Sequence, residues 1–414
     1  MVDYKRVQEE GKGRRWMPNG EVLGREDTAR MGQELTTIFR LLLSVSIIVM
    51  SESRSNLPFS NPKFDPCNKT LNSGTFHDNG QLSWEPSWLS DKDKVLLQNS
   101  KQKLKPDVVV ASDGSGRYKT IGEAVRVAPS RSNKRFVIYV KKGIYRENVN
   151  VEDDKWNVMI YGDGIGKTIV SNNLSIGDRL STAKTSTFAA FGKGFIAMDM
   201  EFQNTAGPTK GQAVALQSSS DQSVFFRCRI AGYQDTLYTR YGRQFYRECQ
   251  ILGTIDFIFG TAAAIIQNSA ILVRRPNPQK VTIITAQGKE TPQTNSGLSI
   301  QNCTIDAAEN LKGIKTYLGR PWKDHSTTVI MGSRLGSLID PEGWLPWNGQ
   351  PPPDTVLYIE YNNRGPGANI ARRVKWKGVK VVNTKDAADK FTVKNFIDGG
   401  RWLPLTTVPF YGGL

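Results

Sequence analysis

The chain has 414 residues, of which 38% are hydrophobic and 38 are glycine, so it can bury a sizeable core in a fold rich in turns. Its 55 lysines and arginines exceed its 39 aspartates and glutamates, and the formal net charge of +16 favours a polyanionic partner, although such a charge also serves general solubility. The sequence shows no dense Lys/Arg run, zinc-ligand spacing or RNA-binding aromatic motif. Nucleic acid is therefore not expected as the partner, which leaves an acidic polysaccharide or a membrane surface.

Three segments precede the first strand-like run. Residues 1–30 are charged and lack apolar periodicity, which predicts a disordered extension. Residues 31–52 contain the apolar run LLLSVSIIVM, which is too short to span a bilayer comfortably but suits the core of a signal peptide. A buried helix is the alternative. We predict a signal peptide beginning at Met31, or a signal anchor, with entry into the secretory pathway and residues 53–103 as a leader or linker.

The character of the sequence changes from residue 104 onward. DVVVA reads as a short strand, and YKTIGEAVRVA (118–128) as one amphipathic helix. Short β-branched and aromatic runs follow, among them RFVIYV, NVMIYG and TIVSN, with Gly, Asn and Asp turns between them and no long helical pattern. This pattern predicts an all-β domain over 104–414 with short flanking helices.

Four segments share one shape, with apolar residues around a small central residue and a closing isoleucine. They are FFRCRI, YRECQI, IIQNSAI and SIQNCTI, and their central residues are Cys228, Cys249, Ser269 and Cys303. The first two steps between these centres are almost equal, and the longer third step fits one coil with an inserted loop. A repeat of this length marks a solenoid, and short strands without helices between them make it a parallel β-helix. A β-sandwich is the alternative, but it gives no reason for a recurring interval.

The interval between the first two centres also relates two pairs of side chains. If one coil has this length, Cys228 lies over Cys249 at the ~4.8 Å spacing of neighbouring strands, within the ~4.4–6.8 Å that separates the Cα atoms of a disulfide. Asp235 lies over Asp256 in the same way, since the same interval separates them. Buried free thiols and two unrelated turn residues are the alternatives. We predict a Cys228–Cys249 disulfide and a stacked carboxylate pair.

Two carboxylates this close cannot both stay ionised without a large penalty, so one pKa rises and the pair offers one proton donor and one anion. Ester hydrolysis, glycoside hydrolysis and calcium-assisted lyase cleavage could all use such a pair. No dense Asp/Glu cluster suits calcium, so neither a metal nor a cofactor is expected. A serine esterase is excluded, since GxSxG is missing and the only histidines are His77 and His325.

The remaining features are the possible glycosylation sites and the cysteines. Asn68, Asn173 and Asn302 begin Asn-x-Ser/Thr sequons, which carry glycans in secreted proteins. No CxxC pair is present, which argues against a thioredoxin-type site. Cys67 and Cys303 are left without an assigned partner.

Four motifs together resemble the signature set of plant pectin methylesterases: GQAVAL (211–216), GYQDTLY (232–238), GTIDFIFG (253–260) and LGRPW (318–322). The resemblance runs from about Asp107 to the C-terminus. It implies a right-handed parallel β-helix, secretion to the cell wall, and hydrolysis of galacturonate methyl esters in homogalacturonan to free carboxylates and methanol.

The resemblance also implies a role for each residue of the site. Asp256 matches the nucleophile, which forms an acyl-enzyme, and Asp235 matches the acid/base. Gln212 and Gln234 match the amides that stabilise the oxyanion, and Arg320 matches the arginine that orients the nucleophile. Ladder amides and a structural ion pair are the alternative roles for these last three residues.

Further residues match positions that contact the sugar chain. Besides Gln212 and Arg320, the substrate-binding residues implied by the resemblance are Thr182, Tyr238, Phe259 and Trp322. A core or edge position is the alternative for the aromatic residues.

The chain differs from the family it resembles in the segment before the domain. Plant members often carry a long inhibitor-like pro-region there. About 50 residues separate the apolar run from the domain here, too few for that helical bundle, so residues 53–103 are expected to be its remnant. Methyl-esterified homogalacturonan is the expected partner, a separate proteinaceous inhibitor is a candidate one, and a monomer is expected. A non-catalytic pectin-binding protein and a pectin depolymerase are the alternative functions.

Overall fold

The computed structural model describes residues 104–382 and 384–414. The predicted N-terminal extension, signal segment and leader (1–30, 31–52 and 53–103), with Cys67 and Asn68, lie outside the described residues. Within the described part, no helix is long and apolar enough to cross a membrane.

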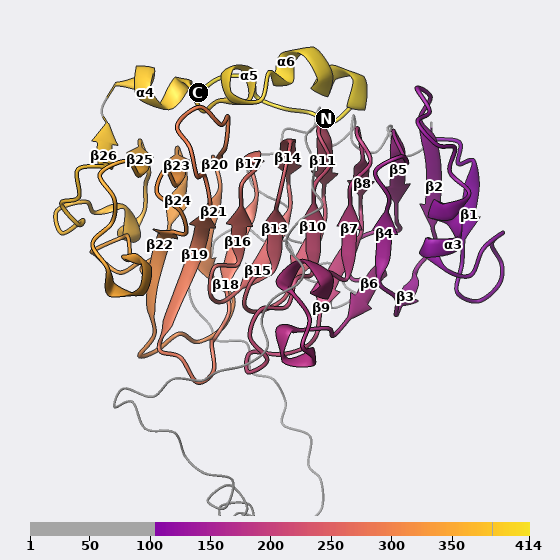
Figure 1. The fold of residues 1–414 in the computed structure, drawn as a ribbon, viewed down its shortest axis with the longest axis horizontal. Coiled ribbons are helices and arrows are strands. Elements are labelled where there is room, and N and C mark those ends of the chain that lie inside the picture. Colours follow the sequence, from indigo (N-terminus) through magenta and orange to yellow (C-terminus); the bar gives the residue numbers. More distant parts are fainter. Residues whose placement is uncertain (1–103, 383) are drawn as a thin grey trace, which may run out of the picture. The chain divides into compact units, whose positions relative to one another are not determined.

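The described chain winds through three parallel sheets, to which successive coils contribute strands in turn (Figure 1). Sheet A has eleven strands, in the spatial order β1 (Val108–Val110), β2 (Phe136–Val140), β5 (Val158–Tyr161), β8 (Ile196–Met198), β11 (Ser223–Phe226), β14 (Arg243–Arg247), β17 (Ala263–Gln267), β20 (Gly297–Gln301), β23 (Thr327–Met331), β25 (Leu357–Tyr361) and β26 (Val379–Val382). Sheet B has eight strands, in the order β3 (Gly143–Tyr145), β6 (Thr168–Asn172), β9 (Glu201–Asn204), β12 (Arg229–Ala231), β15 (Gln250–Gly253), β18 (Ala270–Val273), β21 (Thr304–Ala307) and β24 (Arg334–Leu335). Sheet C has seven strands, in the order β4 (Val149–Val151), β7 (Phe188–Ala190), β10 (Leu216–Ser218), β13 (Leu237–Thr239), β16 (Ile258–Gly260), β19 (Val281–Gln287) and β22 (Lys315–Pro321).

The strand register confirms the predicted solenoid. In sheet C Leu216 pairs with Leu237 and Leu237 pairs with Ile258, and these two steps along the chain equal the interval from Cys228 to Cys249. In sheet A Ala263 pairs with Gly297, which repeats the longer step from Ser269 to Cys303 expected for a coil with an inserted loop. The predicted parallel β-helix is therefore correct.

Aromatic and branched side chains fill the interior of the coils. Phe225 stacks on Tyr246 in the next coil, with ring centroids 4.9 Å apart, and lies 5.8 Å from Phe195 in the preceding one. All three are fully buried, and burial of each such side chain stabilises the fold by about 1.5–3 kcal/mol. Because every coil buries its inner face only against its neighbours, the core is one continuous column.

Short helices flank the solenoid, as predicted. The amphipathic segment forms α3 (Ile121–Arg126), with Thr120 as a capping-box N-cap. Near the C-terminus α4 (Lys385–Asp389), α5 (Val393–Phe396), α6 (Gly399–Trp402) and the 3-10 turn η5 (Leu403–Thr406) follow one another along one side of the solenoid (Figure 1). Their apolar side chains, Trp402 among them, cover the outward residues Phe226 and Phe245 of sheet A.

Tight turns join the sheet A strands β8, β11, β14, β17 and β20 to the sheet B strands that follow them. One residue of each of these five turns is left-handed, with φ between +51° and +54° at Asp199, Arg227, Glu248, Asn268 and Asn302. Asn and Asp tolerate this conformation better than other non-glycine residues, which explains part of the recurring sequence pattern. Asn302 is exposed, as is Asn173 of the other described sequon.

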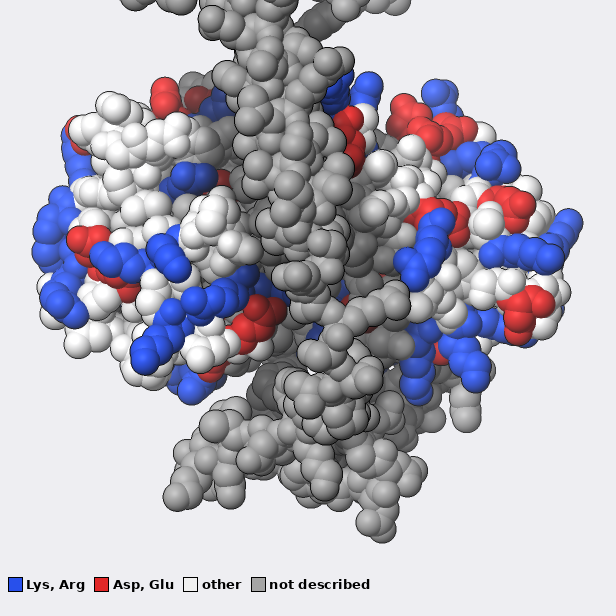
Figure 2. Space-filling view, turned by 90° about the horizontal axis from the view of Figure 1, so that it is seen from below, with Lys and Arg blue, Asp and Glu red and all other residues white. Residues whose placement is uncertain are grey.

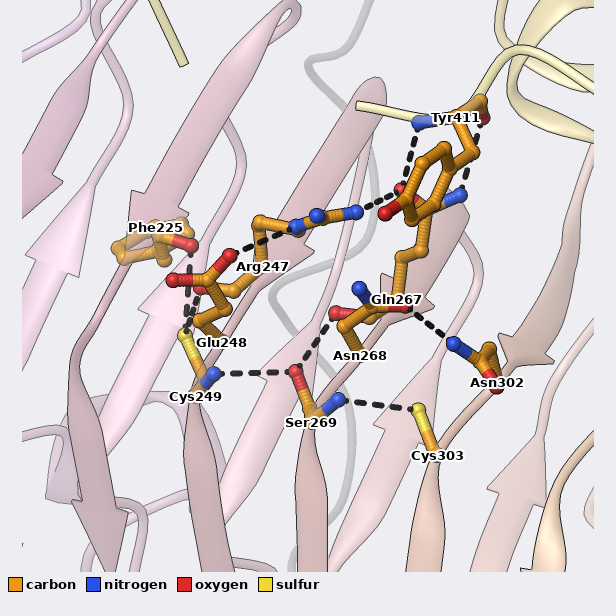
Figure 3. Close-up of polar contacts among 10 residues, drawn as sticks. All are labelled: Phe225, Arg247, Glu248, Cys249, Gln267, Asn268, Ser269, Asn302, Cys303 and Tyr411. Atoms are coloured by element: carbon orange, nitrogen blue, oxygen red, sulfur yellow. Dashed lines mark hydrogen bonds and ion pairs between the residues drawn. The ribbon is translucent and has the colours of Figure 1, made fainter. Parts of the chain in front are cut away.

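The residues that follow Glu248, Asn268 and Asn302 form a polar ladder along these turns. The backbone N–H of Cys249 donates to Ser269 Oγ (3.0 Å), and that of Ser269 donates to Cys303 Sγ (3.4 Å), as Figure 3 shows. The Cys303 N–H continues the ladder to Ser333 Oγ (3.0 Å). The central residues of the sequence repeat are therefore turn residues that satisfy buried backbone groups.

The predicted stacking of Cys228 and Cys249 is correct, but the predicted disulfide is wrong. Arg229 pairs with Gln250 one residue further along, so the two cysteines lie on adjacent coils, and both are buried free thiols. Cys228 Sγ donates to the carbonyl of Ala197 (3.5 Å), and Cys249 Sγ donates to the carbonyl of Phe225 (3.3 Å). Each thiol thus finds an acceptor on the preceding coil, so Cα proximity alone does not decide whether the bond forms.

Burial raises the pKa of the Cys228 thiol well above its ordinary value and that of Cys303 to about 12. We expect no alkylation of Cys228, Cys249 or Cys303 in the folded protein, because all three thiols are buried and out of reach of the reagent. After denaturation without a reductant, all three should be alkylated, which peptide mass spectrometry would measure. If Cys228 and Cys249 stay unlabelled until a reductant is added, the two residues form the predicted disulfide after all.

Candidate active site

Asp235 and Asp256 lie in equivalent turns of adjacent coils. Asp235 lies two residues before Leu237 and Asp256 two residues before Ile258, and these two strand residues pair with each other. The backbone N–H of Asp235 also donates to the carbonyl of Ile255 (3.0 Å) on the next coil. Both aspartates are left-handed, with φ of +61° and +51°, and they are only 8% and 6% exposed. The predicted stacked carboxylate pair is therefore present and almost closed to solvent.

Arg320 reaches this pair from β22, two strands beyond β16. Phe259 pairs with Ala286, which pairs with Arg320, so the small alanine lies between the arginine and the aromatic ring in the same row. Arg320 Nε donates to Asp256 Oδ1 (2.9 Å) and Nη2 donates to Oδ2 (2.5 Å), a bidentate ion pair. The Asp256 carboxylate is thereby fixed in orientation.

The electrostatic environment distinguishes the two carboxyl groups. Burial and then the neighbouring charge of Asp256 raise the pKa of Asp235 well above its ordinary value. Burial also raises the pKa of Asp256, but the hydrogen bonds and charge of Arg320 oppose that rise. A single proton shared by the pair therefore resides on Asp235, and Asp256 is the anion.

The two predicted glutamines lie on consecutive coils, and of the two only Gln234 makes a contact with the carboxylate pair among the described residues. The Gln234 side chain forms a hydrogen bond to Asp235 that acts to lower its pKa, against the larger effects of burial and of Asp256. The carbonyl of Gln234 accepts from the Ala213 N–H (3.1 Å), which places Gln212 on the coil before it. Gln212 is half-buried, and its carbonyl accepts from Ile176 N–H (3.0 Å).

Three aromatic side chains form a continuous surface next to the carboxylates. Tyr238 stacks on Phe259 with ring centroids 4.3 Å apart, and Phe259 meets Trp322 edge-on at 6.1 Å. We call Tyr238, Phe259 and Trp322 the aromatic platform. Phe259 is buried between them, whereas Tyr238 and Trp322 are half-buried and keep part of their rings open to solvent, where an aromatic face suits the apolar face of a sugar ring.

Thr182 begins the 3-10 turn η2 (Thr182–Thr185), on a coil preceding the carboxylates. Its carbonyl accepts from Thr185 Oγ (2.7 Å), and Thr185 Oγ in turn accepts from the Val214 N–H (3.0 Å). Val214 packs with Phe259 in one apolar cluster. Thr182 is therefore linked to the platform only through Thr185 and Val214, and its own hydrogen bond lies within its turn.

The comparisons with known proteins agree with this geometry. A family model described as Pectinesterase matches residues 107–400, which include every site residue named above. The chain belongs to the pectinesterase family. It is 56% identical over 319 residues to the putative pectinesterase/pectinesterase inhibitor 24 of Arabidopsis thaliana, covering 77% of this chain and 57% of that protein. It is 52% identical over 326 residues to pectinesterase 3 of Phaseolus vulgaris, covering 78% of this chain and 56% of that one.

Among solved structures, the chain is similar to the pectin methylesterase from carrot. The two are 48% identical, with a TM-score of 0.74, over 75% of this chain and 99% of the carrot chain. The predicted right-handed parallel β-helix is therefore confirmed. The chain spans little more than half the length of the curated pectinesterases named above.

Two residues near this pectinesterase-family site were not found from the sequence. Trp347, in the 3-10 turn η3 (Trp347–Gly349), places its ring 4.2 Å from the guanidinium carbon of Arg320. Gln217 is buried in the same sheet row as Tyr238, and its Oε1 accepts from Ser186 Oγ (3.2 Å). Trp347 carries no motif signal, whereas Gln217 could have been found by extending the coil interval backwards from Tyr238.

The raised pKa of Asp235 makes its ionised form destabilising in the folded protein. The contribution of Asp235 to the free energy of unfolding is fully present below the unfolded pKa of about 3.9. It is lost as the pH rises through the pKa of Asp235 in the folded protein. We therefore expect Asp235→Asn to raise the Tm at pH 7 by about 2–4 °C, the shift for roughly 1 kcal/mol, with the gain vanishing near pH 4.

Differential scanning fluorimetry across this pH range would measure the effect. Asp354→Asn is the matched control, because Asp354 is 70% exposed and its ion pair within the described part of the chain is with the exposed Lys377. An Asp235→Asn protein with the same Tm as the parent at every pH would contradict the raised pKa.

Proposed function

We propose that this chain is a pectin methylesterase that hydrolyses galacturonate methyl esters of homogalacturonan through an aspartyl acyl-enzyme. The observation that carries the proposal is the Asp235–Asp256 pair with Arg320 bidentate on Asp256. This arrangement separates an oriented anion from a neighbouring proton donor, as covalent ester hydrolysis requires.

In the first half of the reaction the Asp256 carboxylate attacks the ester carbonyl carbon. The tetrahedral oxyanion would be stabilised by N–H groups of the Gln212 and Gln234 side-chain amides. When the bond to the methoxy oxygen breaks, Asp235 donates its proton to that oxygen and methanol leaves. The product of this step is an anhydride between Asp256 and the uronate.

In the second half Asp235, now ionised, accepts a proton from water while the water oxygen attacks the uronate carbonyl. The anhydride bond breaks, and Asp256 leaves as a carboxylate held by Arg320. The uronic acid then loses its remaining proton to solvent, and the pair returns to its starting protonation state.

Pectin also fits the surface charge. On the face drawn in Figure 2, the visible Lys and Arg side chains are spread out with Asp and Glu side chains among them, rather than gathered into one patch. A diffuse positive charge attracts a polyanion without selecting one site on it. Substrate position is then decided at the aromatic platform and the carboxylate pair. We infer that the enzyme is secreted to the cell wall and acts there as a monomer.

Asp256→Asn should abolish methanol release from highly methylated pectin, with a loss of about 10³-fold or more, because the amide cannot act as the nucleophile. Asn tolerates the left-handed backbone, so the variant should fold. The full chain would be assayed for methanol, with polymer length followed by viscometry. Asp306→Asn is the control, because Asp306 is a partly exposed carboxylate paired with Arg334 rather than with a site residue.

Methanol release from the parent at unchanged polymer length supports the proposal. Shortened chains would indicate a depolymerase instead, and tight pectin binding without methanol would indicate a binding protein.

Arg320→Gln should move the acidic limb of the pH–rate profile to higher pH. Arg320 opposes the rise in the pKa of Asp256, so its removal leaves Asp256 protonated, and unable to attack, over a wider acidic range. The pH dependence of kcat/KM for methanol release measures this limb. An unshifted limb accompanied by a lower rate would mean that Arg320 acts only through orientation.

A further inference from the structure

A second row of residues follows the strands of sheet C, one position beyond their last paired residues. Thr239 pairs with Gly260, Gly260 with Gln287, and Gln287 with Pro321. The next residue on each chain segment is therefore also in register. We call these residues the turn row: Arg240, Thr261, Gly288 and Trp322.

Direct contacts join the members of the turn row. The Trp322 ring lies so close over Gly288 that a Cβ there would stand 2.5 Å from the ring, and 3.3 Å from the Thr261 methyl group. Thr261 Oγ donates to the carbonyl of Arg240 (2.5 Å), while the Arg240 N–H donates to the carbonyl of Ser218 (2.8 Å). The backbone of Arg240 is thus held in line with the indole of the platform.

The side chain of Arg240 stands at the other end of the platform from Trp322. Its guanidinium carbon lies 6.0 Å from the ring centroid of Tyr238, and its charge acts to lower the pKa of that tyrosine, which burial raises. Arg240 itself is exposed to solvent. A cation therefore borders the surface on which a sugar ring would lie.

Within the described residues, Arg240 forms no ion pair, although its neighbours do. Asp221 is occupied by Arg243 at 2.7 Å, and at the Trp322 end Lys323 is neutralised by Glu290 at 3.1 Å. Arg320 is committed to Asp256. Arg240 is thus an unpaired guanidinium beside the platform, and its planar fork suits a carboxylate.

We propose that Arg240 binds the free carboxylate of a uronate unit neighbouring the ester that reacts. This inference rests on the proposed function. The carboxylate pair faces a neutral ester, so the reacting unit gains nothing from an extra cation, whereas an adjacent demethylated unit carries one negative charge. Arg240 would therefore make partly demethylated pectin a better substrate than fully methylated pectin.

The expected effect is modest because Arg240 is exposed. A solvent-exposed ion pair changes an equilibrium by a factor of roughly 1.5–5, and salt screens it. We expect Arg240→Gln to lower, by about threefold, the ratio of kcat/KM on half-demethylated pectin to kcat/KM on highly methylated pectin, through KM rather than kcat. Arg240→Lys should retain part of this preference, and added salt should reduce it in the parent.

Arg372→Gln is the matched control. Arg372 is an exposed arginine on the segment before β26, and the described residues show no ion pair for it. Its substitution therefore removes the same charge from a segment that carries none of the platform residues. The Arg372→Gln protein should show the same ratio of the two kcat/KM values as the parent. An unchanged ratio in Arg240→Gln, or an equal fall in Arg372→Gln, overturns the inference in favour of a general charge effect.

A binding measurement separates this inference from the proposed function. Affinity electrophoresis of the full-length proteins through polygalacturonate, which carries no ester, reports carboxylate recognition whether or not methanol is released. Weaker retardation of Arg240→Gln than of both the parent and Arg372→Gln supports the carboxylate site. Equal retardation of all three proteins would show that Arg240 does not bind a carboxylate, even if the parent is an active esterase.

Discussion

The in-register stacking of parallel coils is the constraint on which the rest of the structure depends. In sheet C each residue lies over its equivalent in the next coil, so one row runs from Gln217 through Tyr238, Phe259 and Ala286 to Arg320. A slip of one residue would turn every such side chain to the other face. The aromatic platform and the arginine that reaches Asp256 therefore share one cause.

The same stacking forces two carboxylates together, which is unfavourable for folding and useful for chemistry. Asp235 and Asp256 adopt left-handed backbone conformations in nearly closed turns, and burial raises the pKa of both. Arg320 opposes the rise in both pKa values, through hydrogen bonds and charge at Asp256 but through charge alone at Asp235. Because the surrounding coils hold all three residues, this asymmetry exists before any substrate binds, as preorganised electrostatic catalysis requires.

Charge is used differently at the two ends of the aromatic platform. At one end Lys323 is paired with Glu290, and beside the carboxylates Arg320 is paired with Asp256. Only Arg240, among these three cations, keeps its charge available within the described residues. The unpaired Arg240 at Tyr238 thus contrasts with the paired Arg320 at Asp256.

The sequence by itself determined the coil length, the stacking of Asp235 over Asp256, and the residues that form the platform. These follow from recurring intervals and from motifs, which are one-dimensional properties of the chain. Side-chain direction and partner choice were decided only by the tertiary structure. Cys228 and Cys249 stack as the interval predicts, yet each thiol donates to a carbonyl of the preceding coil and no disulfide forms. Trp347 reaches Arg320, and Arg240 lacks an acid partner among the described residues, because of where distant coils place their side chains, which local spacing does not encode.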